Sequence, residues 1–184
     1  MSFFSSEIAG KRLELLKEAM PEITHAVELW DRSTPREFKG PMEAAARVIK
    51  IAVEFIDVDS ADMLESTFAA LAKKRVRGVV IRETPMLISN ARLVGAIASK
   101  HRIAAIGFKE VAEGGGLLGY GADISAMWRR AATFIDKILK GAKPGDLPVE
   151  QATKFDLIVN QKTAKALGIK IPNSILVRAE RVIE

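Results

Sequence analysis

The chain contains no cysteine, and this absence removes several kinds of site at once. Its 184 residues cannot form a disulfide, a thiolate zinc site, an iron–sulfur cluster or a cysteine nucleophile. Long apolar runs are also missing, since no stretch approaches the ~20 apolar residues that cross a membrane. The first residues lack the basic and apolar regions of a secretory signal peptide, so the sequence as written predicts none.

An excess of charge of either sign is nearly absent. The chain has 28 Lys+Arg and 23 Asp+Glu, a net charge of +5. The longest basic cluster, residues 73–77, falls where a helix is expected to end, and cations there complement the helix dipole. No aromatic side chains interleave with the cations, as a single-strand nucleic-acid surface would require. We therefore expect no nucleic-acid partner.

Recognisable catalytic and metal-binding motifs are missing too. The two histidines, His25 and His101, each lie at a helix–strand junction and share no metal-ligand spacing. No Walker A sequence or nucleophile elbow occurs, and Gly114–Gly116 lacks the spacing of a dinucleotide fingerprint. Asp57 and Asp59 flank the end of a predicted strand without the partners of a phosphoacceptor site, so we expect turn and cap roles. The sequence predicts no catalytic residue, metal site or cofactor.

What is present is an alternation of helical and strand patterns over one domain's length. A first helix is followed by strands at residues 23–30, 53–58, 78–81 and 103–107, with helices between them. We expect Gly40-Pro41 to break or kink the first of these helices, and Asp59 or Ser60 to cap the next. This order predicts an α/β fold, a mostly parallel sheet in a three-layer αβα arrangement.

The remainder has a different pattern. It predicts an extended segment at 117–121, a long helix at 123–140 capped by Asp123, a linker at 143–148, a strand at 155–159 and a helix ending at Gly168. A last short helix or tail begins at Pro172. The long helix carries an apolar stripe at spacings of three and four residues.

The carboxyl ends of the parallel strands are where such sheets bind ligands. The side chains expected there offer aromatic faces, a cation, carboxylates and a hydroxyl but no nucleophile with its base, so binding fits better than catalysis. The candidate ligand-binding residues are Trp30, Asp31, Arg82, Thr84, Phe108 and Glu110.

The chain resembles the C-terminal part of the substrate-binding proteins of ABC importers, which have the type I periplasmic binding fold. The matching stretches are residues 5–18 (SSEIAGKRLELLKE), 115–121 (GGLLGYG), 129–151, 153–160 (TKFDLIVN) and 162–168 (KTAKALG). In place of the family's Leu-Trp-Asn-Pro and Pro-Asp-Pro-type loops stand Leu29-Trp30-Asp31-Arg32 and Arg82-Glu83-Thr84-Pro85. The ligand of better-known relatives therefore cannot simply be transferred.

The resemblance implies binding, without catalysis, of a small solute, an amino acid or a small organic anion, in a cleft between two lobes. Delivery to the membrane subunits of an ABC permease would follow, in the periplasm or outside the cell. Trp30 and Phe108 would pack on the solute, Arg82 would pair with an anionic group, and Asp31 or Glu110 would take an amine. A ligand-sensing effector domain of a regulator or receptor is the alternative that the same fold allows.

The resemblance also divides the chain. Residues 6–113 and 150–184 are expected to form the second-lobe α/β core, and residues 117–148 to pack on a first lobe that this chain does not contain. Without that lobe, the helix 123–140 would expose an apolar face. We therefore expect a homodimer through this helix in the isolated chain.

Overall fold

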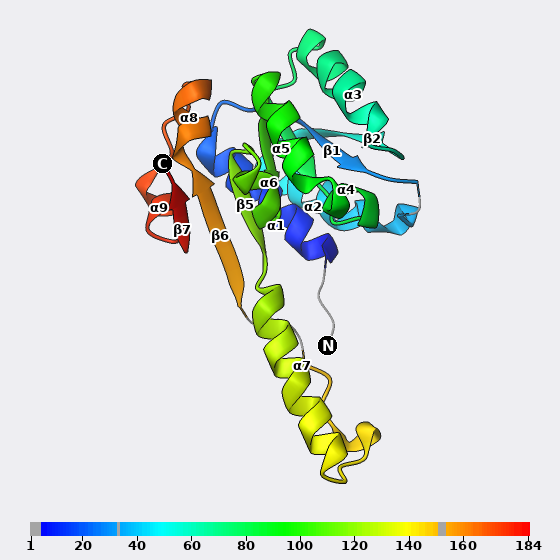
Figure 1. Cartoon of the computed structure of the whole chain (residues 1–184). Coiled ribbons are helices and arrows are strands. Elements are labelled where there is room, and N and C mark those ends of the chain that lie inside the picture. Colours follow the sequence, from blue (N-terminus) through cyan, green and yellow to red (C-terminus); the bar gives the residue numbers. More distant parts are fainter. Residues whose placement is uncertain (1–4, 33, 151–153) are drawn as a thin grey trace.

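The computed structural model describes residues 5–32, 34–150 and 154–184, and they form one body with one projecting helix (Figure 1). The first half contains α1 (Ser5–Ala19), β1 (His25–Trp30), the 3₁₀ helix η1 (Arg36–Phe38), α2 (Lys39–Ile49), β2 (Ala52–Asp57), α3 (Asp62–Lys73) and β3 (Gly78–Ile81). The second half contains α4 (Pro85–Ser89), α5 (Ala91–Lys100), β4 (Ala104–Gly107), α6 (Lys109–Glu113), β5 (Leu118–Ala122), α7 (Ile124–Leu139), η2 (Pro144–Asp146), β6 (Phe155–Asn160), α8 (Gln161–Leu167), α9 (Asn173–Leu176) and β7 (Arg181–Ile183).

The strands form one seven-stranded sheet in the order β2-β1-β3-β4-β5-β6-β7. Every neighbouring pair is parallel except β5 and β6, which run antiparallel with Leu118 opposite Val159. The predicted mostly parallel α/β sheet is confirmed. As a result, the carboxyl ends of β1, β3, β4 and β5 meet at one edge of the sheet.

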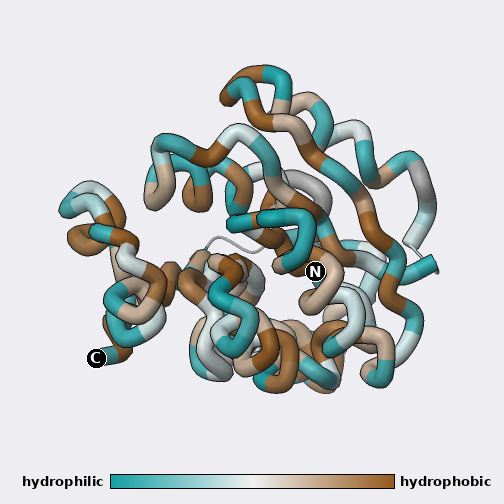
Figure 2. Tube along the Cα trace, turned by 90° about the horizontal axis from the view of Figure 1, so that it is seen from above, coloured by the Kyte–Doolittle hydropathy of each residue, from teal (hydrophilic) through white to brown (hydrophobic). Residues whose placement is uncertain are grey.

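Helices cover both faces, which confirms the three layers. One core cluster joins α1 and α2 to residues such as Ala26, Val80 and Leu118 on one face of the sheet. The other joins α3 and α5 to Val27, Leu29 and Ile81 on the opposite face. Along the helices, hydrophobic and hydrophilic segments alternate (Figure 2), as expected when one side of each helix is buried.

Some local expectations were wrong. α2 starts at Lys39, so Gly40 and Pro41 lie in its first turn rather than at a break. Proline is tolerated there because the first N–H groups of a helix have no intrahelical partner. The N-cap of α3 is Ala61, without a side-chain cap, while Asp59 accepts a hydrogen bond from the Arg32 N–H. The short elements α6 and β7 had no clear signal in the sequence, and α4, which begins with a Thr84 cap and Pro85, was not expected.

α7 leaves the body below β5 (Figure 1). Its predicted cap is confirmed, since the Asp123 carboxylate accepts a hydrogen bond from the Ala126 N–H at 2.9 Å. Residues 117–148 were expected to form one segment apart from the α/β core. Their first part instead forms β5 within the sheet, and the chain leaves the body only at α7. Side chains along α7 are exposed, including Ile124, Trp128, Ile135, Ile138 and Leu139.

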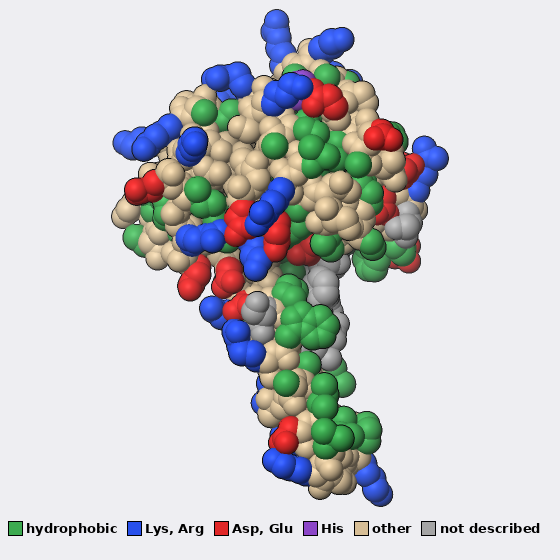
Figure 3. Space-filling view, viewed as in Figure 1, with side chains coloured by type: hydrophobic (Ala, Val, Ile, Leu, Met, Phe, Trp, Pro, Cys, Tyr) green, Lys and Arg blue, Asp and Glu red, His purple; other side chains and the backbone are tan. Residues whose placement is uncertain are grey.

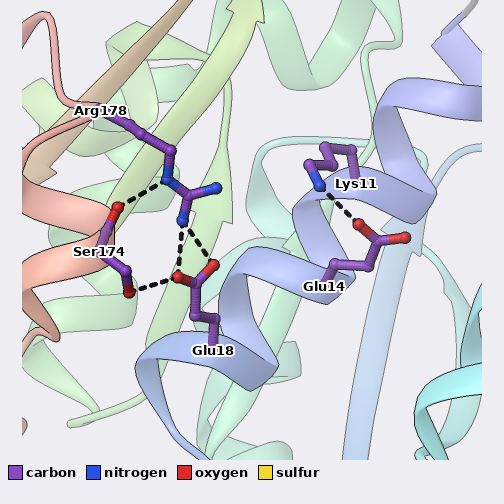
Figure 4. Close-up of polar contacts among 5 residues, drawn as sticks. All are labelled: Lys11, Glu14, Glu18, Ser174 and Arg178. Carbon is purple, nitrogen blue, oxygen red and sulfur yellow. Dashed lines mark hydrogen bonds and ion pairs between the residues drawn. The ribbon is translucent and has the colours of Figure 1, made fainter.

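The C-terminal elements lie at the edge of the sheet beyond β6 (Figures 1 and 2). Glu18 of α1 accepts hydrogen bonds from Ser174 at 2.6 Å and from Arg178 at 2.6 and 2.7 Å (Figure 4). These bonds fasten α9 and the turn after it to the first helix, although the residues are far apart in the sequence.

Candidate functional site

A hollow of about 440 Å³ lies at the carboxyl edge of the sheet, beside the start of α7. This volume is within the range of small-molecule sites. It is lined by Glu83, Ile88, Phe108, Lys109, Glu110, Gly121, Ala122, Ile124, Trp128 and Asp156. The ends of β3, β4 and β5 therefore supply one wall, and the first turns of α7 supply another.

The floor of the hollow is built around Arg12 of α1, a fully buried cation. Its Nε donates to the Tyr120 carbonyl at 2.7 Å, and its Nη1 donates to the Ile81 carbonyl at 3.1 Å. Its Nη2 binds the Glu83 carboxylate at 2.9 Å, and the guanidinium lies 5.9 Å from the centre of the Phe108 ring. One side chain thus joins the ends of β3 and β5 and orients two residues that line the hollow.

Negative charge predominates in the lining of this hollow. Glu83, Glu110 and Asp156 contribute carboxylates, while Lys109 is the cation among the lining residues and lies 3.8 Å from Glu110. Arg12 pairs with Oε1 of Glu83, whereas the buried Oε2 has no hydrogen-bond partner among the described residues. Ile88, Phe108, Ile124 and Trp128 provide apolar surface. The arrangement suits a solute with a cationic group and an apolar body.

Arg82 points away from this hollow and is itself buried. Its Nε donates to Glu28 at 2.7 Å, and its Nη2 donates to the Phe38 carbonyl at 3.1 Å. Glu28 faces Val80 in the register of β1 and β3, so Arg82 lies two residues farther on the same face of the sheet. Burial raises the pKa of Glu28, against the opposing effect of Arg82.

Trp30 is fully buried at the end of β1. Its ring lies 5.4 Å from that of Phe55, and the Lys39 ammonium lies 4.9 Å from the Trp30 ring centre. The Arg82 guanidinium is 5.7 Å from the same ring. Trp30 therefore packs among β2, α2 and the buried Arg82–Glu28 pair.

Thr84 and Asp31 organise the loops at this edge. Thr84 caps α4 by accepting from the Leu87 N–H at 3.4 Å. The Thr34 hydroxyl lies 3.4 Å from the Asp31 carboxylate, across the turn that follows β1. Both side chains are largely buried.

Of the six predicted ligand-binding residues, the structure brings Phe108 and Glu110 to the hollow. It places Trp30, Asp31, Arg82 and Thr84 outside the hollow's lining. Their contact with a solute stays a prediction. Sequence reasoning missed Glu83, Trp128 and the supporting Arg12. Glu28, a charged residue within the apolar run of β1, was the available signal that buried polar pairs lie near this edge.

Neither histidine lies at the hollow. His101 contacts Glu65 at 2.8 Å, and His25 lies 3.9 Å from Glu54. Over the described parts of the chain, no group of three or more His, Asp or Glu side chains could hold a metal ion. In the same parts, no helix is long and apolar enough to cross a membrane.

Comparison with known proteins decides the family. The sequence profile described as ABC transporter substrate binding protein matches residues 5–183. The chain belongs to this family. Its predicted resemblance, and the periplasmic binding protein-like fold, are confirmed.

Solved structures share this fold. An ABC domain from Streptococcus pneumoniae in complex with L-Trp is 26% identical with a TM-score of 0.83, and the match covers 96% of this chain and 60% of that one. A conserved domain protein from Vibrio cholerae has the same TM-score at 22% identity, covering 95% of this chain and 60% of that one. A LacI family regulator from Bifidobacterium animalis shares the fold with a TM-score of 0.64 at 11% identity, covering 84% of this chain and 60% of that one.

A curated relative is the tyrosine-binding protein of Clostridioides difficile. It is 27% identical over 86 residues, which is 46% of this chain and 25% of that protein. The match to this chain thus spans about 60% of the solved relatives' length and a quarter of the curated one.

Proposed function

We propose that this chain is one half of a solute-binding protein that closes on an amino acid with an apolar side chain and delivers it to an ABC importer. The observation that carries the proposal is the acidic hollow at the carboxyl edge of the sheet, with apolar walls from Phe108 and Trp128. An amino acid carries an ammonium group that such carboxylates attract. Related proteins described as binding L-Trp and tyrosine support this class of solute.

Within this proposal the residues have distinct roles. Glu83 and Glu110 accept hydrogen bonds from the ammonium group, and Phe108 and Trp128 pack on the side chain. Arg12 is a positioning residue, because its ion pair with Glu83 holds that carboxylate in place. Among the described residues that line the hollow, none offers a guanidinium to the solute's carboxylate, so in this proposal the facing lobe binds that group. No step of covalent chemistry is part of the proposed function.

We propose further that α7 packs on that facing lobe. Its exposed apolar residues, Trp128 at 69% and Leu139 at 82%, form a surface that an isolated lobe leaves in water. Because Ile124 and Trp128 also line the hollow, α7 would couple the lobe interface to the bound solute. The location outside the cytoplasm and the permease partner belong to the same proposal.

A thermal-shift screen of amino acids and organic acids tests the function. We expect apolar and aromatic amino acids to stabilise the fold by about 2.7 kcal/mol at a hundredfold excess over the dissociation constant. Organic acids without an amine should give no shift. Glu83→Gln should abolish the response, whereas Glu14→Gln, an exposed change on α1, should keep it. Stabilisation by organic acids alone would contradict the proposal.

A further inference from the structure

The edge of the sheet opposite the hollow is basic. The turns that precede β2, β3 and β4, together with α8 and the residues after it, place their side chains there. Six exposed cations at this edge have no ion-pair partner among the described residues: Lys50, Lys73, Arg75, Arg102, Lys165 and Lys170. We call these six residues the basic edge. In Figure 3, Lys and Arg side chains gather on the end of the body that points away from α7.

The carboxylates near the basic edge form ion pairs with other cations. Glu22 pairs with Arg77, Glu54 with Lys74, and Glu65 with Lys100 and His101. They neutralise neighbouring cations and leave the basic edge itself uncompensated. The positive charge is therefore concentrated along one side of a molecule whose net charge is only +5.

Backbone conformation provides an independent observation. Lys50, Arg75 and Arg102 have φ values of 56°, 59° and 56°. Each occupies a helix-to-strand turn at the same edge, a position that favours glycine or asparagine because other residues are strained there. In all three turns the strained position carries a cation.

The surface between these turns is shallow and partly apolar. Arg77 and Arg102 flank a hollow of about 210 Å³, and Lys165 and Lys170 flank one of about 380 Å³. Both hollows share Ile169, so they adjoin, and no carboxylate lines either one. The cations run from the β2 end of the sheet to α8, which is a spread suited to an extended anionic surface rather than to one small anion.

We propose that the basic edge binds the surface of an anionic phospholipid bilayer. The charges attract lipid phosphates, and because the contact is electrostatic it is reversible and sensitive to salt. This contact would hold the protein near the membrane in which an importer lies, with the solute hollow at the other edge of the sheet. It does not depend on whether a solute binds.

Co-sedimentation of the chain with lipid vesicles tests this proposal. We expect binding to vesicles of equal parts phosphatidylglycerol and phosphatidylcholine, no binding to phosphatidylcholine alone, and loss of binding as salt is raised. A variant with Arg75→Asn, Arg102→Asn, Lys165→Gln and Lys170→Gln should bind at least tenfold more weakly, since each cation near an anionic bilayer contributes about fivefold. Asparagine tolerates the left-handed conformation at residues 75 and 102.

The matched control removes the same charge elsewhere, with Arg129→Gln, Lys137→Gln, Lys140→Gln and Lys143→Gln on α7 and the turn after it, and should bind as the unmodified chain does. Equal loss in both variants would show a general charge effect and overturn the proposal. Displacement by inorganic phosphate at low concentration would instead indicate a site for a free anion. Tighter binding to duplex DNA than to vesicles would overturn it in favour of nucleic acid.

Discussion

At the scale of single residues, the Arg82–Glu28 pair is the feature whose loss should cost most. Both side chains are almost fully buried and lie 2.7 Å apart. Arg82→Met would leave Glu28 buried without its partner, so we expect the free energy of unfolding to fall by about 3–5 kcal/mol. Urea denaturation measures this. The double variant with Glu28→Gln should recover part of the loss, and a single variant as stable as the parent would contradict the buried pair.

Glu113 should give a pH-dependent contribution. The hydrogen bond from Arg181 lowers the pKa of Glu113 below its ordinary value, with a further contribution from Arg92. The folded state therefore favours the ionised form, and the stabilisation is present above the ordinary carboxyl pKa and is lost as the pH falls through the lowered value. Glu113→Gln should cost under about 1 kcal/mol near neutral pH.

The difference between the parent and Glu113→Gln should vanish in acid. Urea denaturation of both proteins over a pH series checks this. A difference that grows as the pH falls would show that the sign is wrong.

The burial of Trp30 and Arg82 could not be predicted from the sequence. Trp30, at the end of β1, and Arg82, just after β3, were expected at the cleft because open α/β sheets bind ligands at the carboxyl ends of their parallel strands. The structure turns them inward because Glu28 offers Arg82 a buried partner two residues along the sheet. Such pairing depends on register, and register is not visible in one sequence.

At the scale of elements, α5 and α6 should be sensitive to a single methyl group. A Cβ at Gly114 would lie 2.4 Å from the Arg92 carbonyl oxygen, which is backbone and cannot move aside. We expect Gly114→Ala to destabilise the fold by about 1–3 kcal/mol in thermal or urea unfolding.

Gly40 is the matched control, since nothing lies within 4 Å of a Cβ there. Because Gly40 is within α2, Gly40→Ala should be neutral or stabilise by up to about 1 kcal/mol. Destabilisation of the same size in both variants would contradict close packing at Gly114.

Elements with strong local signals were predictable. The cap Asp123 and the apolar stripe predicted α7, and Gly168 predicted the end of α8. The spacing of apolar residues predicts that one side of α7 is apolar, but it does not predict what that side contacts. α6 and β7 are too short for periodicity to identify, and the Glu113–Arg181 ion pair joins them although they are far apart in the sequence.

At the scale of the whole molecule, the exposed face of α7 predicts self-association of the isolated chain. Trp128, Ile135 and Leu139 of α7 are exposed. Figure 3 shows hydrophobic side chains in a band along the projecting helix. We expect a dimer by light scattering, and Trp128→Gln with Leu139→Gln should shift it to a monomer. A monomeric parent chain at high concentration would contradict this prediction.

The central claim is that this chain recognises the ammonium group of an apolar amino acid at Glu83 and Glu110. Isothermal titration calorimetry with L-tryptophan and with its analogue lacking the amine, indole-3-propionate, tests it most directly. We predict that L-tryptophan binds and that the analogue binds at least tenfold more weakly, because Oε2 of Glu83, which Arg12 does not reach, would then stay buried without a hydrogen-bond partner. Equal affinity for the two compounds, or binding of the analogue alone, would contradict the claim.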